Sequence, residues 1–299
     1  MRPAPSIVVV AGATASGKSE FAENLALEIG GEILNADSQQ FYKGFDIGTG
    51  KVPPGQRRSP HWLLDLCRPG ERMTAMEFVR HAEAAIADVS ARGRVPVLVG
   101  GTGLYLKALL EGLDEMPPRH PEIRAKLQEE AQVLGAPALH SRLQEIDPVS
   151  AAKISPQDPL RIIRYLEISM AAGRPASELM RGERPAELRF PTRTHWLRPE
   201  RSVLAQRIAE RVEAMFRAGW MEEVRLLQEQ GFDPRVLENR PIGYVEVADA
   251  LAGLRSVEDA KAEIIFRTRQ YAKRQETFFR GMFSHPAYDA VIHSQFPDI

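Results

Sequence analysis

The residues that most directly indicate chemistry are GATASGKS at positions 12–19. They match the pattern G-x-x-x-x-G-K-[ST], in which glycines let backbone N–H groups turn toward a phosphate, the lysine reaches outer phosphate oxygens and the last hydroxyl binds Mg²⁺. The alternative is a chance glycine-rich turn. Because the motif follows an apolar run and precedes a helical pattern, we expect a phosphate-binding loop with Ser19 as the metal ligand, formed by Gly12, Ala13, Thr14, Ala15, Ser16, Gly17, Lys18 and Ser19.

Such a loop indicates a polyphosphate, such as ATP, or a diphosphate, and does not specify the reaction. NTPases of this type usually carry a magnesium-binding Asp at the end of another apolar strand. Here the apolar run 95–99 ends in the glycine-rich segment 100–103, and the sequence contains no NKxD guanine-reading motif. These features argue against hydrolysis of ATP or GTP. Thr102, between two glycines, could donate a hydrogen bond to a phosphate oxygen, and the alternative is a plain tight turn.

Asp37 follows the short apolar run 33–34, which is predicted to be a strand. The carboxyl ends of strands form the edge at which α/β folds bind ligands. A carboxylate there can accept a proton from a nucleophile. The alternative is an Asx turn or a helix cap, and the residue alone favours that interpretation.

These residues must be positioned by a parallel sheet. The runs 7–11 and 95–99 are apolar throughout instead of alternating, which is typical of strands covered on both faces. Helical spacing follows the first run, and Thr74 with Glu77 forms a capping box that begins a helix ending near residues 92–93. The fold class is therefore α/β, with a P-loop NTPase-like parallel sheet flanked by helices.

The pattern changes after Gly112, where prolines interrupt the chain and helices are predicted at 121–134, 138–146 and 159–171. We interpret residues 114–189 as a mainly helical insertion domain. The core domain then comprises 1–113 and 190–299, in which 194–197 rejoins the sheet. Four C-terminal helices are expected at 202–218, 221–230, 244–252 and 256–283.

Composition excludes several classes of protein. The chain has 299 residues and a net charge of −1, so it carries no overall basic signature for nucleic acid. A single cysteine, Cys67, excludes an intramolecular disulfide framework and a multi-cysteine metal site. No apolar run approaches the length of a membrane span, and we expect a cytoplasmic protein.

One segment departs from this neutral balance. Residues 267–280 carry five basic residues against the single acidic residue Glu276, with Tyr271, Phe278 and Phe279 interleaved. This pattern suits contact with nucleic acid. On the residues alone, the favoured alternative is a solvated helix face above a buried aromatic stripe.

The phosphate-binding loop is one of several motifs that occur in a specific order along the chain. Together they resemble the motifs of the bacterial tRNA dimethylallyltransferases over nearly the whole chain. The matching segments are DSQQFY (37–42), DIGTGK (46–51), GGTGLY (100–105), Asp158-x-x-Arg161-x-x-Arg164-x-x-Glu167, Arg211-x-x-x-Met215-x-x-x-Gly219, Ile242-Gly243-Tyr244 and Tyr271 to Arg280. The zinc finger of the eukaryotic relatives is missing, as the single cysteine requires.

The resemblance implies transfer of a dimethylallyl group from dimethylallyl diphosphate to the exocyclic amine of the adenosine 3′ of the anticodon. The phosphate-binding loop would hold the diphosphate with Mg²⁺, and Asp37 would be the general base. Thr102 and Arg211 would stabilise the leaving diphosphate. Arg211 by itself is equally well explained as a solvated helix arginine.

The resemblance also implies tRNA as a partner, bound through its anticodon stem-loop, and a monomeric enzyme. The target base must leave its stack to reach a pocket. The residues expected to contact tRNA are Asp37, Ser38, Gln39, Gln40, Thr102, Arg124, Leu160, Arg161, Arg164, Arg240, Gly243, Tyr244, Lys273, Arg274, Gln275 and Arg280.

Two other functions remain compatible with the residues. A small-molecule kinase of the P-loop type would use the helical insertion as a lid and would form ADP. A non-catalytic RNA-binding protein would bind anticodon stem-loops without turnover.

Overall fold

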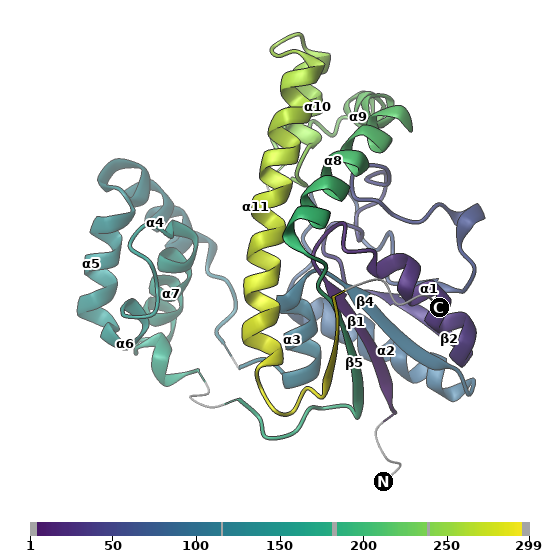
Figure 1. Ribbon diagram of the computed structural model, residues 1–299. Coiled ribbons are helices and arrows are strands. Elements are labelled where there is room, and N and C mark those ends of the chain that lie inside the picture. The colour runs from purple at the N-terminus through teal and green to yellow at the C-terminus, as the bar shows by residue number, and fades with distance from the viewer. Residues whose placement is uncertain (1–4, 115, 181–183, 238–239, 295–299) are drawn as a thin grey trace. The chain divides into compact units, whose positions relative to one another are not determined.

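A computed structural model describes residues 5–114, 116–180, 184–237 and 240–294, and within them the strands form one parallel sheet (Figure 1). The strand order is β3-β2-β4-β1-β5-β6, and each neighbouring pair runs parallel. The bounds are β1 Ile7–Gly12, β2 Gly31–Asn35, β3 His61–Trp62, β4 Val95–Gly100, β5 Thr192–Leu197 and β6 Ala290–His293. The predicted α/β class is thereby confirmed.

The central strand β1 is apolar throughout because both of its faces are covered. Val8 and Val10 pack in one cluster with Phe21 of helix α1, while the intervening Ile7 and Val9 are also fully buried. Since alternate side chains of a strand point to opposite faces, this burial requires a layer on each side. The carboxyl ends of β1, β2 and β4 therefore lie at the same edge of the sheet, between two helical layers.

Helices connect the strands in the core. They are α1 Lys18–Ile29, α2 Ala75–Ala91 and α3 Gly103–Glu111. The predicted capping box is confirmed: the Thr74 hydroxyl accepts from the Glu77 N–H at 3.2 Å, and the Glu77 carboxylate accepts from the Thr74 N–H at 2.7 Å. This pairing satisfies two N–H groups that the first turn would otherwise leave unpaired.

The last third of the chain supplies four helices: α8 Arg201–Arg217, α9 Trp220–Glu229, α10 Tyr244–Leu251 and α11 Val257–Phe283. They enclose an apolar cluster that includes Phe45, Trp220 and Tyr244. Phe45 comes from the segment after β2, so this cluster joins the C-terminal helices to the polar loops at the sheet edge. Helix α11 also packs on α3 and β1.

Residues Leu113–Pro185 form a separate compact unit, and the remainder of the chain forms the other unit. The bounds predicted for the insertion domain are 114–189. The smaller unit has its own core, in which Leu143, Ile162 and Leu166 are buried. Its helices are α4 Pro121–Leu134, α5 Ala136–Ile146, α6 Pro148–Ala151 and α7 Pro159–Ala172.

Three short elements differ from the expectation, because β3, β6 and α6 are absent from the sequence-based assignment. Each has four residues or fewer. Segments of this length show no periodicity of their own, and β3 and β6 exist because they pair with β2 and β5. The two 3₁₀ turns, Pro54–Gln56 and Ala176–Glu178, lie in connections.

Candidate functional site

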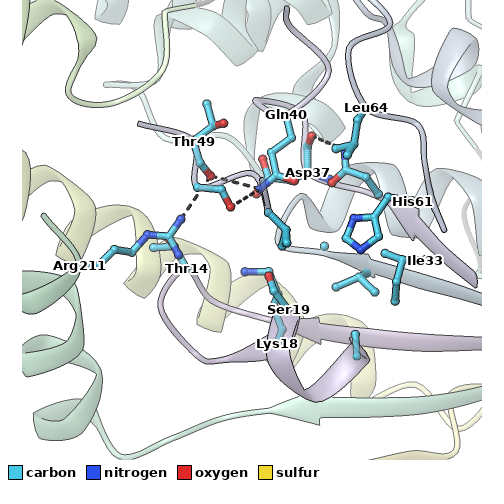
Figure 2. A pocket seen from close by; sticks show the side chains of 16 residues that line it. Thr14, Lys18, Ser19, Ile33, Asp37, Gln40, Thr49, His61, Leu64 and Arg211 are labelled. Carbon is cyan, nitrogen blue, oxygen red and sulfur yellow. Dashed lines mark hydrogen bonds between the residues drawn. The ribbon is translucent and has the colours of Figure 1, made fainter. Parts of the chain in front are cut away.

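The phosphate-binding loop joins β1 to α1 at the carboxyl edge of the sheet. Ala15 and Gly17 have left-handed backbone, with φ of 61° and 85°, and such residues turn successive N–H groups toward one side. The Lys18 amine donates to the carbonyl oxygen of Ala13 at 3.2 Å. Lys18 and Ser19 line a cavity together with other polar groups of this edge (Figure 2).

Two predicted phosphate ligands in the loop are engaged within the protein. The Thr14 N–H donates to the Gln275 side chain at 2.8 Å, and the Ser16 N–H donates to the Ala13 carbonyl oxygen at 3.2 Å. The Ser16 side chain is buried beside Gly12, where an added Cβ would collide with its hydroxyl. These two backbone N–H groups are therefore bonded within the protein, and the predicted contact of the whole loop with phosphate stays a prediction.

Asp37 lies directly after β2 and lines two cavities. Its Oδ1 accepts a hydrogen bond from the Gln39 N–H at 3.0 Å, so the residue forms the Asx turn that was the alternative interpretation. The Asn35 side chain accepts from the Asp37 N–H at 3.0 Å and fixes the backbone at the same point. The turn orients the carboxylate, and it is compatible with a role in proton transfer.

Thr102 and Ser38 join the two loops at the ends of β4 and β2. The Ser38 N–H donates to Thr102 Oγ1 at 2.9 Å, and Thr102 Oγ1 lies 3.2 Å from Ser38 Oγ. The hydroxyl thus lies against Ser38, the residue after Asp37, and its predicted hydrogen bond to a phosphate oxygen stays a prediction. Gln40, for which contact with tRNA stays a prediction, donates from its side-chain amide to the carbonyl oxygens of Thr49 at 3.2 Å and Gly50 at 3.3 Å.

Arg211 projects from α8 into the same cavity, as Figure 2 shows, and is not a solvated helix residue. Its Nη2 donates to the Thr49 carbonyl oxygen at 3.2 Å. Burial lowers the pKa of Lys18 to about 8, with the Asp37 carboxylate opposing this change and Arg211 adding to it. Burial also lowers the pKa of Arg211, and Asp37 opposes that change. Two cations and one carboxylate therefore share this cavity, each of them half-buried.

A second cavity of 310 Å³ continues from Asp37 toward the C-terminal helices. Its volume is within the range of small-molecule sites. Its lining combines polar groups near Asp37 with apolar and aromatic side chains farther out. These include Ser38, Gln39, Met215, Trp220, Arg240, Ile242, Tyr271 and Arg274.

Gln275 of α11 holds the loops of the site together. Its Oε1 accepts from the Thr14 N–H at 2.8 Å, and its Nε2 donates to the Gly101 carbonyl oxygen at 2.9 Å. The residue is 5% exposed. Its side chain therefore links the phosphate-binding loop to the loop after β4, and its predicted contact with tRNA stays a prediction.

Other predicted tRNA contacts on α11 are exposed. Lys273, Arg274 and Arg280 all reach the surface, and the Arg274 guanidinium lies 5.8 Å from the centre of the Tyr271 ring. Arg280 forms an ion pair with Glu276 at 2.6 Å. Phe279 is fully buried, whereas Phe278 is exposed and Tyr271 is half-buried, so the alternative interpretation of a buried aromatic stripe holds for Phe279 alone among these three rings.

The start of α10 differs from the prediction in part. Arg240 is exposed and lines the second cavity. Tyr244 is 0% exposed and its hydroxyl donates to Glu223 at 2.5 Å, so its side chain does not face RNA in this arrangement. Gly243 is buried with φ of 98°, and an added Cβ would collide with Trp220.

In the smaller unit, one buried carboxylate holds two of the predicted arginines. Glu167 is 0% exposed and pairs with Arg124 and Arg164, each at 3.1 Å, and also accepts from the His120 N–H at 2.8 Å. Leu160 and Arg161 at the start of α7 are exposed. At the start of α7, an apolar side chain, Leu160, and a charged side chain, Arg161, therefore face solvent.

Sequence reasoning missed four residues that shape the site: Thr49, Trp220, Glu223 and Tyr271. Tyr271 lies in a quoted motif and lines the second cavity with Asp37. Burial is the main cause that raises the pKa of Tyr271, and the Asp37 carboxylate raises it further. The Tyr271 hydroxyl also interacts with Thr102. Thr49 also lies in a quoted motif, DIGTGK. Trp220 and Glu223 have no local signal, because their partners lie far away in the chain.

Among the described residues, no group of three or more His, Cys, Asp or Glu side chains is arranged to hold a metal ion. The donor set near Ser19 instead suits a cation that keeps water and substrate phosphate as ligands, as Mg²⁺ does. None of the helices in those residues is long and apolar enough to cross a membrane.

Comparison with known proteins gives consistent matches. The family model described as IPP transferase matches residues 40–282. A tRNA dimethylallyltransferase of Anaeromyxobacter sp. (strain K) is 49% identical, covering 92% of this chain and 90% of that protein. A tRNA dimethylallyltransferase of Geobacter sulfurreducens is 44% identical, covering 92% and 88%.

Solved structures agree with these matches. A tRNA isopentenylpyrophosphate transferase from Bacillus halodurans has a TM-score of 0.67 at 33% identity, covering 96% of this chain and 89% of that chain. A eukaryotic dimethylallyltransferase acting on tRNA has a TM-score of 0.80 at 29% identity, covering 98% and 75%.

Proposed function

The chain belongs to the tRNA dimethylallyltransferase family and transfers a dimethylallyl group to tRNA, and on this premise we propose how its residues carry out the reaction. The acceptor is the exocyclic amine of the adenosine 3′ of the anticodon, and the donor is dimethylallyl diphosphate. The bond from C1 of the prenyl group to the diphosphate oxygen breaks, and a bond from C1 to the amine nitrogen forms. Diphosphate leaves with the electron pair.

The observation that carries this proposal is that Lys18 and Arg211 lie in one cavity beside Asp37. Two partly buried cations repel each other, and an anion between them offsets that repulsion. A diphosphate supplies such an anion and gains negative charge as the C–O bond breaks. Lys18, Arg211 and the Thr102 hydroxyl would therefore stabilise the transition state more than the ground state.

The acceptor amine is a poor nucleophile because its lone pair is delocalised into the adenine ring. Asp37 lies where the two cavities meet, so its carboxylate would accept the amine proton as the C–N bond forms. The 310 Å³ cavity would receive the flipped base, with Ser38 and Gln39 at its polar end.

The Ser19 hydroxyl would hold Mg²⁺ together with the diphosphate oxygens. When bound, the cation would neutralise charge on the leaving diphosphate. The exposed basic residues Arg240, Lys273 and Arg274 would contact the anticodon stem-loop, and Arg161 with Leu160 would contact tRNA from the smaller unit. We propose that the enzyme acts as a monomer in the cytoplasm, with 114–189 as the insertion domain.

The direct test mixes the protein with labelled dimethylallyl diphosphate, Mg²⁺ and unmodified tRNA. Label should enter tRNA that carries adenosine 3′ of its anticodon. A matched tRNA with guanosine at that position carries a carbonyl oxygen in place of the 6-amino group of adenine and should remain unlabelled. Labelling of both tRNAs, or of neither, would contradict the assigned acceptor.

The role of Asp37 is tested by Asp37→Asn, which keeps the shape of the side chain and removes the base. Transfer should fall by about 10²- to 10⁴-fold while tRNA affinity stays the same. Asp88→Asn, at an exposed position on α2, is the matched control. Near-normal turnover of Asp37→Asn would assign the proton to another group.

A P-loop kinase is the second candidate, and nucleotide consumption separates the two functions. The transferase requires no ATP and forms no ADP. ADP formation that depends on Lys18 would favour the kinase.

A further inference from the structure

The carboxylate of Glu223 on α9 lies in a ring of hydrogen-bond donors from another part of the chain. Three consecutive backbone groups donate to it: Asp46 N–H at 3.0 Å, Ile47 N–H at 2.6 Å and Gly48 N–H at 3.3 Å. Consecutive N–H groups that converge in this way form a binding site for an anion. Here the anion is a side chain of the protein itself, and it fixes the loop at residues 46–51.

Two further contacts, one to the carboxylate and one to the loop, support this arrangement. The Tyr244 hydroxyl donates to Glu223 Oε1 at 2.5 Å, and Tyr244 is completely buried. Trp220, one turn earlier on α9, packs so closely on Gly48 that an added Cβ there would collide with its ring. The loop is therefore attached to α9 and α10 by charge-assisted hydrogen bonds and by packing.

The carbonyl oxygens of the same loop point to the phosphate cavity. The Thr49 carbonyl oxygen accepts from Arg211 Nη2 at 3.2 Å and from Gln40 Nε2 at 3.2 Å. Thr49 and Gly50 line the cavity that contains Lys18 and Asp37, and an added Cβ at Gly50 would collide with the Arg211 guanidinium. The position of Arg211 thus depends on the position of this loop.

We propose that Glu223 is a positioning residue for prenyl transfer, acting through the loop 46–51 on Arg211. It contacts neither substrate. By holding the N–H side of the loop, it fixes the Thr49 carbonyl oxygen that orients the guanidinium toward the leaving diphosphate. This inference rests on the proposed role of Arg211 in stabilising that diphosphate.

The test is a double-mutant cycle between Glu223→Gln and Arg211→Ala. The glutamine amide would direct its own N–H₂ donor at backbone N–H groups that need an acceptor. Glu223→Gln should therefore release the loop. We expect kcat to fall by about ten- to a hundredfold, inorganic diphosphate to bind more weakly by a similar factor, and tRNA affinity to stay within twofold. In the Arg211→Ala background, the same substitution should have no further effect on kcat.

The matched control is Glu222→Gln, the preceding residue of α9, which is exposed and pairs with Arg225. It should leave kcat and diphosphate binding unchanged. If Glu223→Gln lowers the melting temperature too far for assay, Tyr244→Phe removes one of the four hydrogen bonds and keeps the packing. This variant should give a smaller loss of kcat that also disappears in the Arg211→Ala background.

Two results would overturn the inference, and they differ in what else they contradict. In the first, Arg211→Ala loses activity and Glu223→Gln lowers kcat by the same factor in the Arg211→Ala background as in the wild type. In that case Glu223 does not act through Arg211, while the proposed site stands. If Arg211→Ala retains full activity, the proposed role of Arg211 fails, and the inference fails with it.

Discussion

Lys18 is the residue whose charge responds most directly to an anion in the phosphate cavity. Burial holds its pKa at about 8, so free protein loses this proton as the pH rises through 8. Bound diphosphate favours the charged amine, and binding above this pH must take up a proton. We therefore predict that diphosphate affinity falls by up to about tenfold per pH unit above pH 8.

Calorimetry in two buffers of different ionisation enthalpy measures this proton uptake. Lys18→Arg is the control, because an arginine stays charged throughout this pH range. The pH dependence that remains in Lys18→Arg belongs to diphosphate itself. Identical pH profiles for the two proteins would show that Lys18 does not titrate during binding.

Single residues differ in how far sequence predicts their roles. Lys18 and Ser19 belong to eight contiguous residues whose backbone geometry is local, so their placement follows from the motif. The place of Asp37 at the sheet edge follows from the strand that ends before it, whereas its role as a base is predicted only from the family resemblance. Gln275 and Glu223 are different, because their partners lie 261 and as many as 177 residues away. Nothing in a local pattern distinguishes Glu223 from the exposed Glu222 beside it.

Helix α11 is an element on which the site depends through Gln275. Replacing this residue by Leu would leave the Thr14 N–H and the Gly101 carbonyl oxygen without their partners. Each buried unpaired group costs about 1–3 kcal/mol, so we predict a loss of stability of that order and weaker diphosphate binding.

Denaturant unfolding and diphosphate titration measure these two effects. Gln270→Leu, at an exposed position on the same helix, is the matched control and should change neither quantity. If Gln275→Leu weakens only tRNA binding, the result would support the predicted tRNA contact of Gln275 and contradict its role as a structural link.

Strands β5 and β6 carry a pair of histidines that makes the sheet edge sensitive to acid. His195 Nδ1 lies 3.0 Å from His293 Nε2, and the Phe21 ring packs against both. Burial, followed by the neighbouring His293, lowers the pKa of His195 from 6.5 to about 4. Between these values the unfolded chain binds a proton that the folded chain excludes, so stability is complete above pH 6.5 and decreases as the pH falls toward 4.

We predict a decrease of at most about 1.4 kcal/mol per pH unit from His195 in this window. Urea unfolding at pH 7, 6 and 5 measures it. His195→Gln should flatten the dependence, whereas His81→Gln, on an exposed face of α2, should retain it. Equal slopes for all three proteins would assign acid sensitivity to other groups.

Elements were predictable where their own residues carry a signal. The apolar run of β4 and the capping box of α2 are complete within the segment that folds. Strands β3 and β6 consist of two and four residues, and β6 exposes Val291 and Ile292. Such segments become strands only because a neighbouring strand offers hydrogen-bond partners, which is tertiary information.

For the whole molecule, the net charge of −1 conceals how charge is distributed. Many basic side chains are neutralised locally, such as Arg225 by Glu222 and Glu229, whereas Lys273 and Arg274 are exposed. We predict that Lys273→Ala with Arg274→Ala weakens tRNA binding and lowers the slope of log affinity against log salt by about 2. Filter binding between 50 and 200 mM salt, about a fourfold range, measures this slope.

The matched control is Arg225→Ala with Arg235→Ala, which removes two exposed arginines that already pair with acidic residues. This protein should retain the original slope. An unchanged slope in the Lys273 and Arg274 variant would return α11 to the solvated-face interpretation.

The position of β1 at the centre of the sheet has a consequence for synthesis. Its neighbours are β4 and β5, and the cavity beside it is completed by Arg211 and by the Gln275 link from α11. A ribosome makes the phosphate-binding loop before β4 and β5, and it makes Arg211 and Gln275 later still. A nascent chain therefore cannot assemble its donor site until most of the protein has left the exit tunnel, and ligand cannot stabilise it before then.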